Sequence, residues 1–486
     1  MRLSDLAAGE AVAVRADHTR VQVPRGTAPV GLRLAAAAVD LALVALPLTV
    51  GALIIHSLRD ANGGGVVDRV VFGGFAIAVA MAVHVWNHGF GQGRRGASTG
   101  KAWLGLIARG PDGRPLGVRN SLLVATPRQV VRRITAVDEG FTEVVVDLTP
   151  ARLRLRRAVG VLALLIVLAV LLLASVAVGS RPLAFGEIWH GLLPPYDANP
   201  TEADLIVRDL RMPRTLLGLV TGIALGLAGG LIQGHTRNPL ADPGILGVSA
   251  GAACAVVVAI MFLDVTSAGG YIWFALAGAL IASSVVFGLS TIGGGNPSPV
   301  SLVLGGAAVA AFLSAITSAV VLLDQATLDA YRFWVVGSVS GRGIEVLTPL
   351  LPFFAVGIVL AVANAPGLNV LSLGEEVARS LGTNIALNRI LGIAAITLLT
   401  GAATAACGPI AFIGLAVPHV ARAFTGPDYR WLLPCSALIG AVMLITCDIL
   451  GRVAARPGEL QVGIVLALVG APFFIALVRR RKLVTL

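Results

Sequence analysis

Three arginines near the ends of long apolar segments carry side chains suited to binding an anion. Arg211 and Arg214 lie just before one apolar segment, and Arg452 lies near the end of another. A guanidinium is a rigid fork of N–H donors that can bind a carboxylate or a phosphate through two parallel hydrogen bonds. These residues are therefore candidates for binding an anionic group. Anchoring to lipid phosphates is one such contact.

A second group of candidates lies where an apolar stretch is interrupted. Gln233, Asn238 and Pro239 begin this interruption, which continues to Gly251 and contains two prolines and three glycines. Irregular backbone at membrane depth leaves N–H and C=O groups unpaired, so it occurs only where protein buries it or where it lines a cavity. The interruption therefore predicts a segment that borders a pathway, with Gln233, Asn238 and Pro239 as candidates to line it.

The sequence contains no evident catalytic or cofactor-binding motif. The run from Gly96 to Ala102 resembles a phosphate-binding loop, but three residues instead of four separate its glycines, and Ala follows Lys101 where Ser or Thr is needed. His84 and His88 have the spacing of helical metal ligands, but no third ligand is near them in the sequence. We therefore predict a protein that is not an enzyme and has no catalytic residue, no cofactor and no metal.

Membrane-spanning helices are predicted to position these residues. The 486 residues are 56% hydrophobic and 13% charged, whereas a soluble domain carries about 25% charged residues. Apolar runs of about 20 residues recur, as in polytopic α-helical membrane proteins. The predicted fold is all-α, a two-helix N-terminal hairpin plus a ten-transmembrane-helix bundle, with helices near residues 31–56, 69–88, 158–178, 214–234, 245–263, 271–291, 301–323, 346–364, 388–406, 411–424, 431–450 and 461–478.

The net charge of +11 is explained by loops on the cytoplasmic side of a membrane. Much of the basic excess lies between residues 89 and 157, and a further basic cluster begins at Arg479. Lys and Arg concentrate in cytoplasmic loops, so both termini are predicted to be cytoplasmic. No groove-reading motif indicates binding to nucleic acid. The predicted divisions are a tail, a two-helix membrane domain, a basic linker and a ten-helix domain, over residues 1–28, 29–119, 120–157 and 158–486.

The ten-helix domain resembles the FecCD-type permeases, the membrane subunits of ABC importers for ferric siderophores, haem and cobalamin. The resemblance covers about residues 151–486 and rests on Arg-x-Pro-Arg at 211–214, Asn-Pro-Leu-Ala-x-Pro-x-x-Leu-Gly at 238–247 and the run Cys407–Arg422. It implies a permease for ferric siderophores in the bacterial plasma membrane. The partners that it implies are ABC ATPase subunits, an extracytoplasmic siderophore-binding protein, a second permease and membrane lipids.

The same resemblance implies roles for individual residues. In this family, arginines at the motif positions of Arg211, Arg214 and Arg452 pair with carboxylates of the binding protein. Residues 374–382 resemble the segment in which a short cytoplasmic helix fits a groove of the ATPase and transmits its closure. The matching residues are Gly374, Glu375, Glu376, Ala378, Leu381 and Gly382. Acidic residues at the start and glycine at the end also suit the two ends of a short helix.

Residues 24–119 resemble the RDD family of small membrane domains. Arg33 and Asp40 lie on one face of the first predicted helix, and Thr99-Gly100-Lys101 follows the hairpin. The further membrane helix usual in this family is missing here, because residues 119–150 are too polar. Charges at membrane depth are costly, so both residues are functional candidates. Alternatively, Arg33 reaches the cytoplasmic interface, and Asp40 pairs with Arg33 or with a neighbouring helix.

Other functions remain open from the sequence alone. The cargo of this family also includes haem and cobalamin, and the second permease is either an identical or a different chain. A secondary transporter or channel would need intramembrane carboxylates as ion relays, and only Asp40 and Asp448 come close, which counts against it. A membrane scaffold or sensor, with the RDD-like domain as its active part, is the remaining alternative.

Overall fold

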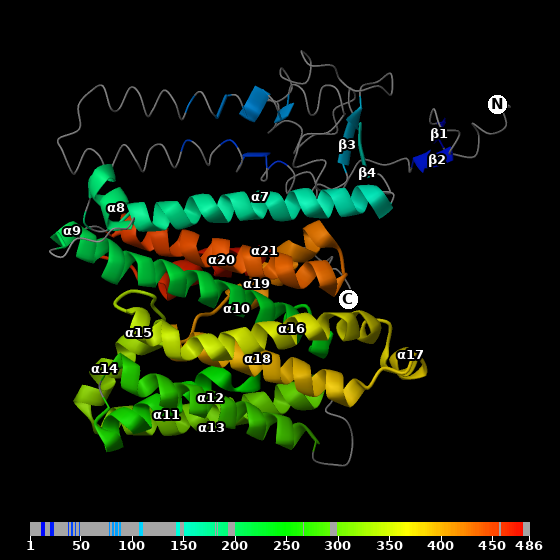
Figure 1. Ribbon diagram of the computed structural model, residues 1–486. Helices are drawn as coiled ribbons and strands as arrows, with labels where there is room; N and C mark the ends of the chain where they lie inside the picture. Colours follow the sequence, from blue (N-terminus) through cyan, green and yellow to red (C-terminus); the bar gives the residue numbers. More distant parts are fainter. Residues whose placement is uncertain are drawn as a thin grey trace. The chain divides into compact units, whose positions relative to one another are not determined.

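The structure is a computed structural model that describes the chain most completely from residue 150 onwards (Figure 1). The described part comprises four short strands and isolated helical positions before residue 150, and then residues 150–179, 181, 183–192, 200–265, 267–291, 299–455 and 458–479. The chain divides into two compact units, Met1–Leu162 and Ala163–Leu486.

The first unit contains two pairs of antiparallel strands. β1 (Ala11–Val14) pairs with β2 (Arg20–Val23), and β3 (Leu106–Arg109) pairs with β4 (Thr142–Val145). The sequence analysis predicts none of these strands. Each has only four residues, which is too short for an alternating pattern to stand out.

The first unit also pairs one of the predicted intramembrane charges. Asn87 donates a hydrogen bond of 2.8 Å from its Nδ2 to Asp40 Oδ1, and both side chains are buried. Asp40 therefore contacts a residue of the second predicted helix, and its role stays a prediction. Arg33 lies outside the described residues.

A bundle of α-helices forms the chain after residue 150, and every helix predicted between residues 158 and 486 has a counterpart in it. Among the described residues, seven helical spans are long and apolar enough to cross a membrane, and α11 and α21 add shorter apolar helices. The bounds are α7 (Pro150–Ala177), α8 (Phe185–Leu192), α9 (Glu202–Leu205), α10 (Met212–Thr236), α11 (Val248–Leu263), α12 (Ala268–Thr291), α13 (Pro299–Leu323), α14 (Gln325–Val335), α15 (Ile344–Leu347), α16 (Leu351–Leu371), α17 (Glu375–Ser380), α18 (Ile385–Cys407), α19 (Ile413–Thr425), α20 (Tyr429–Ala454) and α21 (Val462–Arg479).

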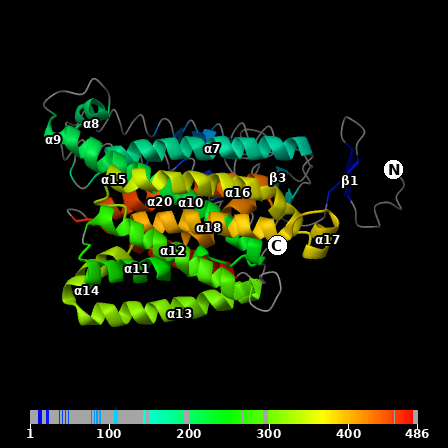
Figure 2. The same ribbon diagram turned by 60° about the horizontal axis from the view of Figure 1, so that its bottom comes forward.

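The short helices lie at the two ends of the bundle. In both views α8, α9, α14 and α15 gather at one end, here called the α14 end, and α17 lies at the opposite end, the α17 end (Figures 1 and 2). α14 begins after Asp324, whose Oδ2 accepts hydrogen bonds from the backbone N and the hydroxyl of Thr327 at 2.7 and 2.6 Å. These hydrogen bonds hold the pKa of Asp324 below its usual value, because they stabilise the carboxylate.

α10 lies at the centre of the bundle, where it packs against α16, α18, α19 and α20. Gly222 and Gly226 of α10 allow α20 to approach closely. A Cβ on Gly226 would lie 2.2 Å from the carbonyl oxygen of Ser436, and one on Gly222 would lie 2.6 Å from the Cα of Ala441. The glycines of this helix therefore serve packing, as expected of small residues between membrane helices.

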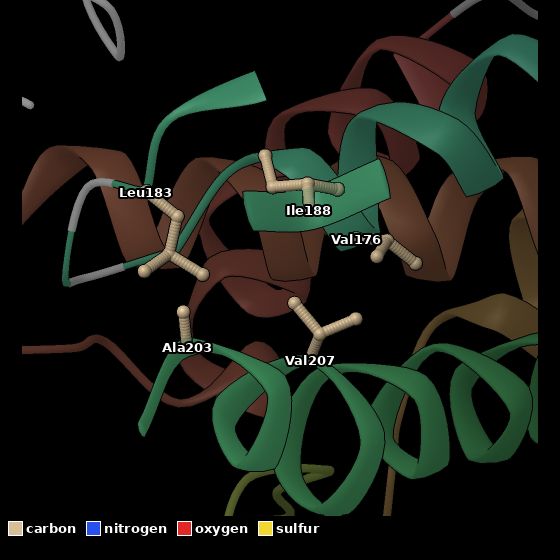
Figure 3. Close-up of a cluster of buried hydrophobic side chains, with 5 residues drawn as sticks. All are labelled: Val176, Leu183, Ile188, Ala203 and Val207. Carbon is tan, nitrogen blue, oxygen red and sulfur yellow. The ribbon is translucent and has the colours of Figure 1, made fainter. Parts of the chain in front are cut away.

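An apolar cluster holds the end of α7 beside the start of α10 (Figure 3). The cluster combines side chains from α7, the segment around α8, α9 and the π-helix Ile206–Arg211 that precedes α10. Its buried members are Val176, Leu183, Ile188, Ala203 and Val207. Its burial removes apolar surface from water and fixes the carbonyl groups at the end of α7 near the first turn of α10.

Replacement of Gly226 by alanine is expected to destabilise the bundle, because the added Cβ meets backbone atoms that cannot rotate away. Overpacking of this kind costs about 1–3 kcal/mol. Gly288 on α12 is the matched control, since nothing lies within 4 Å of a Cβ placed there and alanine has the higher helix propensity. Thermal unfolding in detergent should give a lower midpoint for Gly226→Ala and an unchanged or higher midpoint for Gly288→Ala. Equal midpoints for the two variants would contradict the packing described here.

Candidate functional site

Asp448 of α20 connects Arg214 of α10 to Arg452 of its own helix. Arg214 donates to Asp448 Oδ1 from Nε at 3.1 Å and from Nη2 at 2.7 Å. Arg452 Nη2 donates to Asp448 Oδ2 at 2.6 Å, and Arg214 Nη1 donates to Glu459 Oε2 at 2.6 Å. These four residues are called the arginine–carboxylate cluster below. Because two guanidiniums face two carboxylates, its charges balance.

Arg211 and Arg452 also cap the end of α7. Arg211 Nη1 donates to the carbonyl oxygens of Val176 and Ala177 at 2.9 and 2.8 Å. Arg452 Nη1 donates to the carbonyl oxygen of Ser175 at 2.7 Å. The last carbonyls of a helix have no partner within the helix and form the negative end of its dipole. The guanidiniums of Arg211 and Arg452 therefore supply hydrogen-bond donors to the last carbonyl groups of α7, where this helix meets α10 and α20.

The three arginines predicted to dock a binding protein are largely buried and contact other residues of this chain. Arg211 and Arg452 are only 5% and 1% exposed, and the Arg214 side chain is 11% exposed. The sequence places them near helix ends, but it does not reveal that Asp448, Glu459 and the carbonyls of α7 already accept their hydrogen bonds. Their contact with a binding protein stays a prediction.

The predicted interruption is a short 3-10 helix, Pro243–Leu246, between α10 and α11. It begins at Asp242, whose Oδ1 accepts a hydrogen bond of 2.8 Å from the backbone N of Gly244. It ends at Gly247, which has a φ of +74°, a value that glycine adopts without steric cost. The prolines and glycines of this segment therefore build the turn that the sequence predicts.

The three residues predicted to line a pathway do not share one surface. Gln233 is fully buried, and its amide joins α10 to α19: Nε2 donates to a backbone carbonyl of α19 at 3.2 Å, and Oε1 accepts from Arg422 at 3.3 Å. The carbonyl oxygen of Pro239 accepts from His419 Nε2 at 2.7 Å. Asn238 is the exposed member. The amide of Gln233 is used within the protein, and the lining of a pathway by these three residues stays a prediction.

The predicted short helix between the sixth and seventh helices of the bundle is present as α17. Gly374 directly precedes it with a φ of +111°, and Gly382 follows with a φ of +77°. Glu375 and Glu376 occupy its first turn, where negative charge favours a helix. The residue types at both ends of the segment therefore match their backbone conformations.

One face of α17 is buried and another is exposed and apolar. Ala378 is fully buried, whereas Val377 and Leu381 are 43% and 62% exposed. Leu373, just before the helix, is 63% exposed. Grouped exposed apolar side chains at a short helix are typical of a surface that another protein covers.

Polar contacts made by α18 and α16 lie between α17 and α10. Arg389 of α18 is 5% exposed and donates from Nη2 to Glu375 of α17. The carbonyl of Asn388 accepts a hydrogen bond of 2.7 Å from Asn364 Nδ2 of α16. Asn364 Oδ1 lies 2.9 Å from the Nε2 of His235, near the end of α10. α17, which resembles the coupling segment, is thus linked through α18 and α16 to α10, the helix that ends at the interruption.

A cavity of about 360 Å³ lies at the α14 end. Its walls come from the start of α12, the end of α14 and two loops, and they include Tyr271, Phe333, Trp334, Arg342, Glu459 and Gln461. The sequence analysis does not predict this cavity, because its walls are far apart in the chain. Arg342, a charged residue between two predicted membrane helices, is the signal that could have pointed to it.

The described part of the chain brings no three His, Cys, Asp or Glu side chains together as metal ligands. The ring centroids of His84 and His88 lie 4.9 Å apart. The four cysteines are free thiols, of which Cys407, Cys435 and Cys447 are buried.

Two families of known proteins match this chain. The model of the FecCD transport family matches residues 166–480, and the model of the RDD family matches residues 27–183. The two matches overlap at α7. The RDD match extends beyond the end at residue 119 that the sequence analysis predicts, and α7 supplies a membrane helix within it.

Several curated relatives and one solved structure are similar to the chain. The ferric enterobactin transport system permease protein FepD of Escherichia coli is 45% identical over 327 residues, which cover 67% of this chain and 96% of that protein. The cobalamin import system permease protein BtuC of Halobacterium salinarum is 40% identical over 283 residues, 58% of this chain and 76% of that protein. A structure of a metal-chelate type ABC transporter in an inward-facing conformation is 28% identical, has a TM-score of 0.59, and covers 67% of this chain and 99% of its own.

Replacement of Asp448 by asparagine is expected to destabilise the protein strongly. It keeps the shape of the side chain but leaves Arg214 and Arg452 without the carboxylate between them, and loss of one partner of a buried ion pair costs about 3–5 kcal/mol. Asp329→Asn is the matched control, because Asp329 pairs with Arg332 on α14 with half of each side chain exposed, and exposed pairs contribute little. Thermal unfolding should show a large drop for Asp448→Asn alone. Similar small shifts for both variants would refute a structural role for the cluster.

Proposed function

The chain belongs to the FecCD transport family, and from this we propose that it is the transmembrane permease subunit of an ABC importer for ferric siderophores. The observation that carries the proposal is the similarity to the ferric enterobactin permease over nearly the full length of that protein. The inward-facing metal-chelate transporter supports the same fold and the same class of cargo. The importer is driven by a separate ATPase, so this chain itself catalyses no reaction.

The ATPase binds at the α17 end in this proposal. α17 offers the exposed apolar side chains of Val377 and Leu381 to a partner, while buried Ala378 and the Glu375–Arg389 pair fix its position on the bundle. Closure of the ATPases moves α17, and the polar contacts to α10 carry this motion toward the interruption. The pathway then changes from outward-facing to inward-facing by movement of packed helices.

The opposite, α14 end faces the outside and receives the siderophore-binding protein. The arginine–carboxylate cluster and Arg211 fix the ends of α7, α10 and α20 there, so they support the docking surface even where their own guanidiniums are buried. A bacterial plasma membrane surrounds the apolar helices, and both termini lie in the cytoplasm. A second permease, identical or different, completes the pathway.

Cobalamin import is the second candidate function. The observation that favours it is the similarity to a cobalamin permease, which covers a smaller share of both chains than the similarity to the ferric enterobactin permease. Because a separate binding protein selects the cargo, the two functions share the fold and the sites described above.

Uptake in cells that lack this chain tests the proposal. Radiolabelled ferric siderophores, haem and cobalamin are supplied separately, and each is measured with and without the wild-type gene. We expect uptake of one ferric siderophore to disappear and to return with the wild type. Loss of cobalamin uptake alone would favour the second candidate, and unchanged uptake of every cargo would favour a membrane scaffold or sensor.

Replacement of Leu381 by aspartate is expected to reduce uptake at least tenfold without loss of the folded chain. The side chain is 62% exposed, so the charge disturbs a contact surface and leaves the packing within the bundle intact. Leu381→Met is the control, since it keeps an apolar side chain of similar volume. Co-purification of the ATPase should fall with uptake for Leu381→Asp and stay normal for Leu381→Met. Full uptake and co-purification with aspartate would contradict the coupling role.

A further inference from the structure

We propose that Arg342, in the cavity at the α14 end, receives a carboxylate side chain of the extracytoplasmic binding protein. This inference rests on the proposed function, which it deepens by assigning the contact to a residue other than Arg211, Arg214 and Arg452. It is carried by the partners of the arginines at this end, by the place of Arg342 in the cavity and by its contacts with Tyr271.

The three arginines of the resembling motifs are already engaged within the chain. Arg214 donates to the carboxylates of Asp448 and Glu459. Arg452 donates to Asp448 as well, and Arg211 donates to carbonyl groups at the end of α7. Removing one partner from a buried ion pair is strongly destabilising. A carboxylate of another protein is therefore better received by an arginine that has no carboxylate of its own.

Arg342 differs in this respect from the exposed arginines at the same end. Those arginines form ion pairs with neighbouring carboxylates, and the pairs are Arg181–Glu202 and Arg332–Asp329. The guanidinium of Arg342 donates to the neutral hydroxyl of Tyr271, and no carboxylate in the described part of the chain forms an ion pair with it. An arginine has five N–H donors, so one bond to a hydroxyl leaves donors for a partner.

Two carboxylates come close to Arg342 in the cavity or in the sequence, and neither pairs with it. Glu459 lines the same cavity, but its Oε2 accepts a hydrogen bond of 2.6 Å from Arg214. Its charge is balanced within the arginine–carboxylate cluster. Glu345, three residues after Arg342, lies with its carboxylate against Gly343. The positive charge of Arg342 therefore remains available to attract an anion.

Arg342 is partly exposed and is held in place by Tyr271. Its guanidinium lies 5.5 Å from the centroid of the Tyr271 ring, and the hydrogen bond to the hydroxyl of the same residue adds a second contact. A cation over an aromatic ring is attracted by the ring. A side chain that is already ordered loses less conformational freedom when a partner binds. Arg342 is therefore both accessible and preorganised.

The cavity suits a single protruding side chain. Pockets for small molecules range from about 300 to 1,000 Å³, and about 360 Å³ lies near the lower limit. Ser338 also lines the cavity, and its Oγ accepts a hydrogen bond of 3.1 Å from the backbone N of Ser340. A hydroxyl that accepts one bond still has a hydrogen to donate. Arg342 and Ser338 thus offer donors to a carboxylate within one cavity.

The occupant of this cavity needs an anionic group that binds no metal. The anionic oxygens of a ferric chelate bind its iron, so they do not enter while the metal stays outside. An aspartate or glutamate side chain carries its carboxylate at the end of a short stem and matches the guanidinium in charge and shape. Because the α14 end receives the binding protein in the proposed function, a carboxylate of that protein is the occupant assigned here.

Affinity for the binding protein tests this assignment. The probe is the purified binding protein required for the uptake described above, and the chain is held with its ATPase in nanodiscs of zwitterionic lipid, so that anionic lipid plays no part. Arg342→Gln is expected to weaken binding at least tenfold, and Arg342→Glu more, because a like charge then faces the carboxylate. Arg332→Gln is the matched control and should stay within twofold of the wild type, since its ion pair is exposed.

A charge exchange separates direct contact from loss of structure. Each exposed Asp and Glu of the binding protein is replaced in turn by Lys. One replacement is expected to weaken binding to the wild type and to strengthen binding to Arg342→Glu at least tenfold, which a folding defect cannot produce. Thermal unfolding checks each variant. If Arg342→Gln proves unstable, Arg342→Lys takes its place and should weaken binding several-fold, because it keeps the charge but lacks the fork.

Three results would overturn the assignment. They are equal binding by the wild type and the Arg342 variants, the absence of any lysine replacement that restores binding, and an effect of Arg342 seen only with cargo-loaded binding protein. The last result would indicate that Arg342 contacts the cargo. Uptake of ferric siderophore by the wild type is measured in parallel. Intact uptake together with any of these results leaves the proposed function standing, whereas absent uptake removes the proposed function as well.

Discussion

Burial of Asp448 between Arg214 and Arg452 is the constraint on which the α14 end of the bundle depends. A buried charge is tolerated only when it is paired and hydrogen-bonded, so this carboxylate fixes where two guanidiniums, and hence α10 and α20, can lie. Arg452 then reaches the carbonyls at the end of α7, and Arg214 reaches Glu459 beyond α20. One balanced set of charges therefore joins three membrane helices to the loop that forms a wall of the cavity.

The helices were predictable and the contacts were not. Long apolar runs locate membrane helices because lipid requires them, and prolines and glycines predict the turn at Pro243–Leu246 and the bounds of α17. The amphipathic helix α14 is missed, because its 11 residues carry no long apolar run. The sequence analysis also does not show which residues of other helices an arginine side chain contacts. Arg214 and Asp448 are 234 positions apart, and no local pattern indicates that they meet.

The two ends of the bundle have different proposed roles. At the α17 end, a short helix with an exposed apolar surface is fastened by Glu375 and Arg389 and connected through Asn364 and His235 to α10. At the α14 end, the arginine–carboxylate cluster holds a rigid frame beside a cavity with aromatic walls. α10 runs between these ends and packs closely on α20, so it is the helix through which we propose that movement at one end reaches the other.

The most direct test of this account is transport by purified components. The chain is reconstituted in liposomes with its ATPase and its siderophore-binding protein, and accumulation of radioiron-labelled ferric siderophore is followed with and without ATP. The account predicts ATP-dependent accumulation that requires the binding protein on the α14 side and the ATPase on the α17 side. Accumulation without ATPase or binding protein, or none with all components present and folded, would contradict it.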